Sequence, residues 1–148
     1  MDNDLKKRIM EYMKTCASCT VATAAADGEP GASAVFFKNR DLDIYFNTGS
    51  DTQKVRNIKA NPRVAITMQA AGSAPTKDKE IKGIQYTGEG AILTDNDMSE
   101  VPRAVMARHR AFNSALPGRS VIVRVTPSKI YLIDYSRGFR HRELLEIS

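Results

Sequence analysis

The residues best suited to chemistry in this chain lie in the segment 45–57, and the chemistry they suit is anion binding. A strand-like pattern stops at Gly49, and a short helical pattern rich in hydroxyls and positive charge follows directly. Free N–H groups at a helix N-terminus carry partial positive charge, so this segment predicts a phosphate site. The alternative is that Ser50 only caps the helix while Lys54 and Arg56 form its solvated face. The residues alone leave both interpretations open.

The two cysteines, Cys16 and Cys19, have the spacing of a redox pair or of half a zinc site. A zinc site needs two further ligands, and the sequence offers no second pair of cysteines and no closely spaced pair of histidines for it. A thioredoxin-like motif needs a βαβ setting, which is also absent. We therefore interpret Cys16 as part of an apolar helix face and Cys19 as the entry to a strand. We expect no metal site.

The two histidines, His109 and His141, have no clear partner in the sequence. His109 stands between Arg108 and Arg110, which predicts an exposed basic face on a helix. Such a face could contact nucleic acid, but no recognised binding fold, aromatic platform or dense basic stripe goes with it. We therefore do not expect nucleic acid as a partner.

The composition fits one compact domain, residues 1–148, with 42% hydrophobic residues and a net charge of +5. Its basic residues are spread along the chain, which suits a phosphorylated ligand as well as a polyanion. The apolar runs are too short to cross a bilayer, and the first residues do not look like a signal peptide. We expect a cytoplasmic protein that does not enter membranes.

Hydrophobic periodicity predicts three helices and about seven strands. Spacings of three and four among Leu5, Ile9, Tyr12 and Met13 predict a helix over residues 4–15. A second helix should run from Ser50 to residue 60, with Gln53 at capping-box spacing, and a third from about residue 97 or 99 to 112. The strands are expected at residues 20–25, 32–38, 42–47, 64–69, 85–94, 120–126 and 129–134.

The order of these elements favours a mainly β, α+β fold. Runs of strands joined by hairpins, without βαβ alternation, predict an antiparallel six- to seven-stranded sheet that closes into a barrel with flanking helices. Gly88 and Gly90 in the fifth strand predict a bulge or a close backbone approach. Residues 70–82 are expected to form one long polar loop.

Several short motifs follow one another in a characteristic order along the chain. They are Tyr-Phe-Asn-Thr at 45–48, Val-Arg-Asn-Ile at 55–58, Asn-Pro-Arg-Val-Ala at 61–65, Tyr-Thr-Gly-Glu-Gly-Ala at 86–91 and Gly-Phe-Arg-His at 138–141. Together they resemble the pyridoxamine-5'-phosphate-oxidase-like FMN-binding split barrels, over most of the chain from about residue 17. The resemblance implies a split barrel and a homodimer with two FMN molecules in clefts shared between the subunits.

The resemblance also implies which residues bind the cofactor. Those expected to line the flavin ring from the second strand are Ser33, Val35 and Phe37, and those expected near the ring or ribityl chain are Asn47 and Thr48. The phosphate is expected to bind Ser50, Thr52, Gln53 and Lys54. Gln85 or Glu89 is expected to complete the site from the other subunit.

The function implied is an FMN-dependent oxidoreductase, in which hydride or electron transfer to a small substrate occurs at the flavin. Catalytic side chains cannot be assigned from the sequence. The ending Glu-Leu-Leu-Glu-Ile-Ser is unlike the arginine-bearing last strand of true pyridoxamine-phosphate oxidases, so vitamin B6 synthesis is not expected. The alternative is a non-catalytic binding or sensor protein for a flavin (FMN or FAD), the deazaflavin F420 or haem, with His141 as a possible axial ligand.

Overall fold

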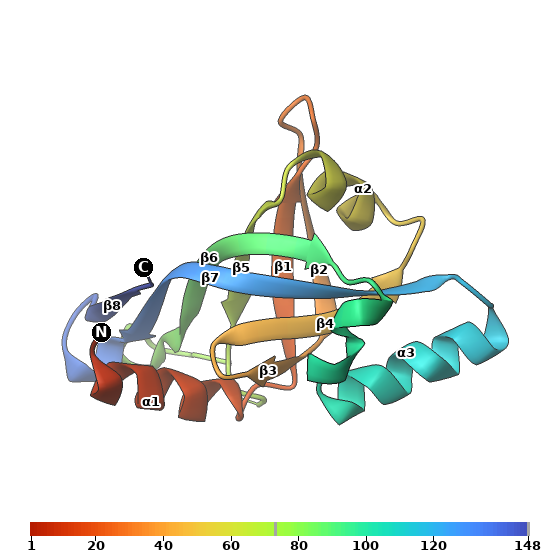
Figure 1. Cartoon of the computed structure of the whole chain (residues 1–148). Helices are drawn as coiled ribbons and strands as arrows, with labels where there is room; N and C mark the ends of the chain where they lie inside the picture. Colours follow the sequence, from red (N-terminus) through yellow and green to blue (C-terminus); the bar gives the residue numbers. More distant parts are fainter. Residues whose placement is uncertain (73, 148) are drawn as a thin grey trace.

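The computed structural model describes residues 1–72 and 74–147, and within them the chain is mainly β (Figure 1). The helices are α1 Asn3–Met13, α2 Gln53–Ala60 and α3 Arg103–Ala115, with 3-10 turns at Asp78–Glu80, Asp95–Glu100 and Tyr135–Arg137. The strands are β1 Ser18–Ala24, β2 Pro30–Phe36, β3 Lys38–Arg40, β4 Asp43–Gly49, β5 Arg63–Met68, β6 Lys82–Ile92, β7 Ser120–Asp134 and β8 Arg142–Glu146.

The strands of the described residues form one antiparallel sheet in the order β2-β1-β5-β6-β7-β4-β3, with β8 pairing to β7. The two ends of this path, β2 and β3, are joined in sequence through the single residue Phe37. A sheet whose first and last strands are covalent neighbours must curl back on itself. The predicted split barrel with flanking helices is therefore confirmed.

The core follows from the alternation of side chains along these strands. One large cluster fills the inside of the curled sheet, where α1 also buries the face predicted for it. A second cluster, which includes Tyr45, Val105 and Ile122, lies between the outside of β4 and α3. Neighbouring residues Ile44 and Tyr45 therefore face opposite sides of β4, the first inside the barrel and the second under α3.

Helix α2 lies beside the β1–β2 hairpin (Figure 1) and closes one part of the barrel with Val55 and Ile58, both buried. Gly90 permits this packing, because a Cβ there would lie 3.3 Å from Ile58 Cγ2. The helix is thus fixed against β1 and β6 by its apolar face. Its N-terminal end is left beside the end of β4.

The prediction of two strands around Pro127 was wrong, because β7 runs unbroken from Ser120 to Asp134. The strand carries a bulge next to Pro127 instead: Thr87 of β6 pairs with Lys129 and Gly88 pairs with Pro127, so Ser128 has no partner residue on β6. A Cβ at Gly88 would come within 2.2 Å of the carbonyl oxygen of Thr126, so only glycine fits. The close backbone approach predicted for this part of β6 is confirmed.

The third helix begins later than predicted. Asp97 and Ser99 belong to a separate 3-10 turn, and α3 starts only at Arg103, after Pro102. Proline restricts the residue before it to extended conformations, so one helix could not run through both segments. Helix α3 lies along the barrel and extends beyond the end of the sheet (Figure 1).

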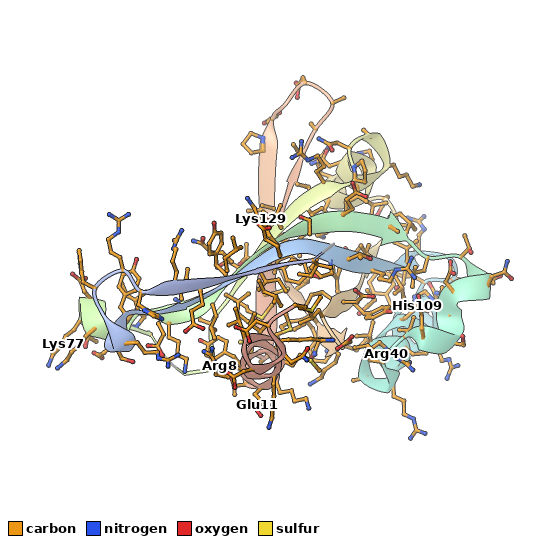
Figure 2. All side chains as sticks on the ribbon, turned by 60° about the vertical axis from the view of Figure 1, so that its left-hand side comes forward. Arg8, Glu11, Arg40, Lys77, His109 and Lys129 are labelled. Atoms are coloured by element: carbon orange, nitrogen blue, oxygen red, sulfur yellow. The ribbon has the colours of Figure 1, made fainter. Side chains whose placement is uncertain are left out.

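Strands β3 and β8 were not predicted. Strand β8 pairs with the end of β7, and its Glu143 accepts hydrogen bonds from Arg8 of α1 at 2.5 Å and from Arg137 at 2.8 Å. His141 Nε2 lies 3.0 Å from the same carboxylate. Figure 2 shows Arg8 on α1, and the helix is seen nearly end-on in this view. These contacts fasten the C-terminal strand to the N-terminal helix.

The contacts of Glu143 predict an acid step, that is, a loss of stability as the pH falls. Hydrogen bonds from Arg8 and then from His141 lower the pKa of Glu143 to about 2. Its contribution is therefore complete above the ordinary glutamate pKa and is lost as the pH falls toward about 2. Glu143→Gln should lower the free energy of unfolding by about 1 kcal/mol at neutral pH and remove this step. Urea unfolding of both proteins across this pH range measures it, with Glu11→Gln as the control, and an unchanged acid step would contradict the prediction.

The predicted polar loop 70–82 is partly described, and residue 73 within it lies outside the described residues, as does residue 148 of the expected 1–148 domain. The part that is described contains the 3-10 turn at Asp78–Glu80. None of the described helices is long and apolar enough to span a membrane.

Candidate functional site

The connection between β4 and α2 is a tight loop held by main-chain hydrogen bonds. Gly49 pairs with Ser120 at the start of β7, and the N–H of Ser50 donates to the carbonyl oxygen of Arg119 at 2.8 Å. The hydroxyl of Thr52 donates to the carbonyl oxygen of Gly49 at 2.9 Å. A Cβ at Gly49 would lie 3.2 Å from Thr52 Cγ2, so glycine keeps this turn compact. The loop is positioned by β7 as well as by its own strand.

Ser50 is not the helix cap, contrary to the prediction. Thr52 occupies the N-cap position of α2, and no side-chain hydrogen bond caps the helix. The hydroxyl of Ser50 instead donates to the carbonyl oxygen of Gly118 at 3.4 Å. The capping-box pattern was misleading because the loop folds back on β7, which the local sequence does not encode. The N–H groups of the first helical turn thus have no side-chain cap in the described structure.

Lys54 projects from the first turn of α2 toward the end of β4, where its ammonium donates to Thr48 Oγ1 at 2.8 Å. Partial burial lowers its pKa, and among the described residues no carboxylate forms an ion pair with it. A cation that is partly removed from water without an anionic partner is costly. An anion at the start of α2 would remove that cost.

The other charged groups of the loop are already engaged. Arg56 donates to the carbonyl oxygen of Asp51 at 2.5 Å and to Gln53 Oε1 at 3.1 Å. Asp51 also forms an ion pair with Arg119 at 3.6 Å, in which both side chains are largely exposed. Sequence reasoning missed Arg119, because only the pairing of Gly49 with Ser120 brings it beside the loop.

Gln53 turns back along its own helix. Its amide donates to Asn57 Oδ1 at 2.7 Å, and the buried Asn57 donates in turn to Thr23 Oγ1 of β1 at 3.0 Å. This chain ties the first turn of α2 to the β1–β2 hairpin. In this arrangement Gln53 can offer a phosphate its main-chain N–H more readily than its side chain.

The residues predicted on other strands lie on different faces of the sheet. Ser33 is half-buried, whereas Val35 and Phe37 belong to the buried core, so a ring contact from these two would use main-chain atoms. Asn47 and Thr48 point to opposite sides of β4. The structure therefore brings together Thr48, Ser50, Thr52, Gln53 and Lys54. Their roles toward a cofactor stay predictions.

Gln85 lies outside this group, exposed on the outer face of β6. Its neighbours across the sheet are Thr67 and Tyr131, and no hydrogen bond joins it to the loop at Ser50. On this outer face the central side chains of β1, β2 and β5 are small and uncharged, whereas Arg63 of β5 lies opposite Glu89 at the edge of the same face. Paired in register, the central side chains are Ala22, Ala32, Ala34, Ala65, Thr20 and Thr67. This partly exposed patch of alanine and threonine presents no bulky or charged side chain to a second sheet.

His109 is not an exposed residue of a basic face, contrary to the prediction, but half-buried between α3 and β7 (Figure 2). Asn113 Oδ1 accepts from the N–H of Ser120 at 2.8 Å, which fixes its amide so that Nδ2 faces His109 Nε2 at 3.3 Å. His109 Nε2 must therefore accept, and Nδ1 donates to Ser120 Oγ at 2.9 Å. This network supports the start of β7 directly behind the loop at Gly49.

The network makes stability depend on the protonation of His109. Burial, with a smaller effect of Arg110, lowers the pKa of His109, and a proton on Nε2 would face the Asn113 amide. The folded state is therefore most stable above the ordinary histidine pKa and loses stability as the pH falls toward the lowered value. We expect His109→Gln to be less stable than the wild type by about 1 kcal/mol near pH 7.5 and to lose this pH dependence. Urea unfolding at several pH values between about 7.5 and 5.5 measures this. If the free energy of unfolding changes with pH equally in the wild type and in His109→Gln, the prediction is contradicted.

The cysteines are both free and buried, Cys16 on the face of α1 and Cys19 in β1. Burial raises the pKa of Cys19 to about 12 and also raises the pKa of Cys16, so both thiols are protonated and unreactive at neutral pH. The described residues contain no group of three or more His, Cys, Asp or Glu side chains that could hold a metal.

The fold and this loop define a class of protein, the small antiparallel split barrels. The match to known families is specific: residues 5–134 match the family model described as pyridoxamine 5'-phosphate oxidase. The chain belongs to the pyridoxamine 5'-phosphate oxidase family, which confirms the resemblance seen in the sequence. No curated protein matches the chain.

Solved structures share the fold at low sequence identity. General stress protein 26 from Bacillus anthracis is 20% identical with a TM-score of 0.67, over 97% of this chain and 98% of that one. A Clostridium acetobutylicum protein related to general stress protein 26 is 14% identical with a TM-score of 0.72, over 99% and 97%. A haem-binding protein from Mycobacterium smegmatis is 13% identical with a TM-score of 0.76, over 95% of this chain and 57% of that one. These likenesses concern the fold.

Proposed function

We propose that the protein binds FMN, with the phosphate at the N-terminus of α2, and that it is an oxidoreductase acting on a small molecule. One observation carries the proposal: Lys54, partly buried and lacking a carboxylate partner among the described residues, lies at the uncapped start of a helix in a family whose members commonly bind flavin. A phosphate there would give Lys54 its counter-ion. It would also accept hydrogen bonds from the free N–H groups of the helix.

The residues of the loop fit a phosphate in size and chemistry. Gly49 keeps the main chain close, and the hydroxyls of Ser50 and Thr52 need only rotate from their carbonyl acceptors to donate to an anion. Asp51 opposes an anion, but its carboxylate is drawn toward Arg119. The donor set therefore favours a phosphate over a neutral group.

When bound, the flavin supplies the hydride or electron transfer, and the chain's own residues bind and orient it. The phosphate end is fixed by the loop and Lys54. From this end the ring would extend along β2, beside the main chain at Ser33 and Val35, with Asn47 at the end of β4 as a polar contact. Val35 is buried in the core and anchors this strand, whose main-chain atoms would contact the ring.

The cofactor site is proposed to be completed by a second copy of the chain. The alanine and threonine patch on the outer face of β1, β2 and β5 suits packing against its own copy, and Gln85 lies on the neighbouring strand of the same face. In a dimer formed on this face, Gln85 of one subunit would approach the flavin of the other. A cytoplasmic location accords with free, unpaired cysteines.

Haem is the second candidate, because two of the structural neighbours bind or store haem. Against it, both histidines have protein partners: His109 is held by Ser120 and Asn113, and His141 lies against Glu143. Haem binding would require His141 to leave this carboxylate.

The spectrum of the purified protein discriminates the candidates. Absorption of an oxidised flavin, released as FMN on denaturation and bleached anaerobically by NAD(P)H, is the result expected. A Soret band would support haem instead, and the absence of any chromophore after incubation with excess FMN would overturn the proposal.

A further inference from the structure

We infer that Arg119 is a second phosphate-binding residue, which exchanges its ion pair with Asp51 for the phosphate of the cofactor and thereby sets the preference for FMN over riboflavin. This inference rests on the proposed function. It concerns a residue of the α3–β7 connection, outside the segment 45–57 in which the sequence placed the phosphate contacts.

The main chain at Arg119 is fixed to the phosphate loop. Its carbonyl oxygen accepts from the N–H of Ser50 at 2.8 Å, and the carbonyl oxygen of Gly118 accepts from the hydroxyl of Ser50 at 3.4 Å. The turn that makes this possible has Gly118 at φ +72°, a conformation that favours glycine. The next residue, Ser120, pairs with Gly49. Arg119 therefore cannot move away from the loop without breaking these contacts.

A second support holds this turn from behind. Asn113 accepts from the N–H of Ser120, and His109 contacts the Ser120 hydroxyl. The backbone is thus fixed on both sides of Arg119, by the loop on one side and by α3 on the other. Only its side chain is free to change partner.

The side chain has a partner that it can leave at little cost. Its guanidinium lies 3.6 Å from Asp51 Oδ2, with 62% of the Arg119 side chain and 73% of the Asp51 side chain exposed. Ion pairs this exposed contribute little to stability. A phosphate monoester carries up to two negative charges and accepts two parallel hydrogen bonds from arginine, so it competes well with one carboxylate.

The charges of the loop indicate why a second cation is needed. Lys54 supplies one positive charge to a dianion, while Asp51 adds a negative one nearby. Arg56 is committed to the Asp51 carbonyl and to Gln53. Of the three cations in or beside the loop, Arg119 is the one whose side chain can turn from its carboxylate partner to neutralise the second charge of the phosphate.

Titrations of the full chain with FMN and with riboflavin test the inference, because riboflavin lacks only the phosphate. Arg119→Gln should weaken FMN binding about tenfold and leave riboflavin binding unchanged, and Arg119→Lys should recover part of the loss. Asp51→Asn should strengthen FMN binding about threefold, because it removes both a competitor and a repulsive charge. Arg103→Gln, an exposed arginine at the start of α3, is the matched control and should change neither affinity.

Each other outcome overturns the inference in a distinguishable way. If the wild type binds FMN tightly and Arg119→Gln binds it equally well, Arg119 is only a surface ion-pair residue. If Arg119→Gln weakens FMN and riboflavin equally, its role is structural. If the wild type shows no preference for FMN over riboflavin, the proposed function fails and the inference fails with it.

Discussion

Replacing Lys54 by methionine is expected to weaken FMN binding about 30- to 100-fold while leaving riboflavin binding nearly unchanged. The substitution keeps most of the aliphatic volume but removes the charge that lies at the start of α2 beside Thr48. Loss of a charge-assisted hydrogen bond to a phosphate costs about 2–3 kcal/mol, which corresponds to this change in affinity. Quenching of flavin fluorescence measures both dissociation constants.

Lys59→Met provides the control, because Lys59 lies in the last turn of the same helix and is exposed. It should bind FMN as the wild type does. Without FMN, Lys54→Met should be at least as stable as the wild type, since the methionine removes a partly buried cation; the prediction concerns affinity alone. Equal FMN affinity in Lys54→Met and Lys59→Met would contradict the placement of the phosphate.

Replacing Ala65 by arginine is expected to convert a dimer into monomers and to weaken FMN binding more than tenfold. Ala65 lies in β5 within the alanine and threonine patch of the outer face, directly across from Ala22 and Thr87. A large charged side chain there would be buried without a partner between two sheets. The monomer should still fold, because Ala65 is exposed within one chain.

Sedimentation velocity with and without FMN measures the dimer, and Ala104→Arg, on the exposed side of α3, is the control. The control should sediment as the wild type does. A wild-type protein that is monomeric when saturated with FMN would contradict the shared site, and so would an Ala65→Arg dimer with unchanged affinity.

The parts of the fold that the sequence predicted are those governed by local patterns. The apolar face of α1 and the alternation in β5 depend on side-chain spacing within one element, and both are found in the structure. In β4 the alternation is incomplete, because α3 covers the outer face and buries Tyr45 beside Ile44 and Phe46. Strands β3 and β8 escaped prediction because β3 has three residues and β8 depends on pairing with β7. Pro102 marked the true start of α3, but the acidic and polar residues before it resembled a helix cap.

The candidate site divides in the same way. The segment from Thr48 to Lys54 was predicted because its residues are contiguous, and the structure brings them together. Arg119 and the His109–Asn113–Ser120 network could not be predicted, since they reach the loop only through the pairing of β4 with β7. That pairing joins residues about 70 positions apart, and no local pattern records it.

The central claim, that the start of α2 binds the phosphate of FMN, is tested most directly by calorimetric titration of the wild-type protein with FMN and with riboflavin under identical conditions. The account predicts one FMN bound per chain, at least tenfold more tightly than riboflavin. Equal affinity for the two flavins, or no binding of either, would contradict it.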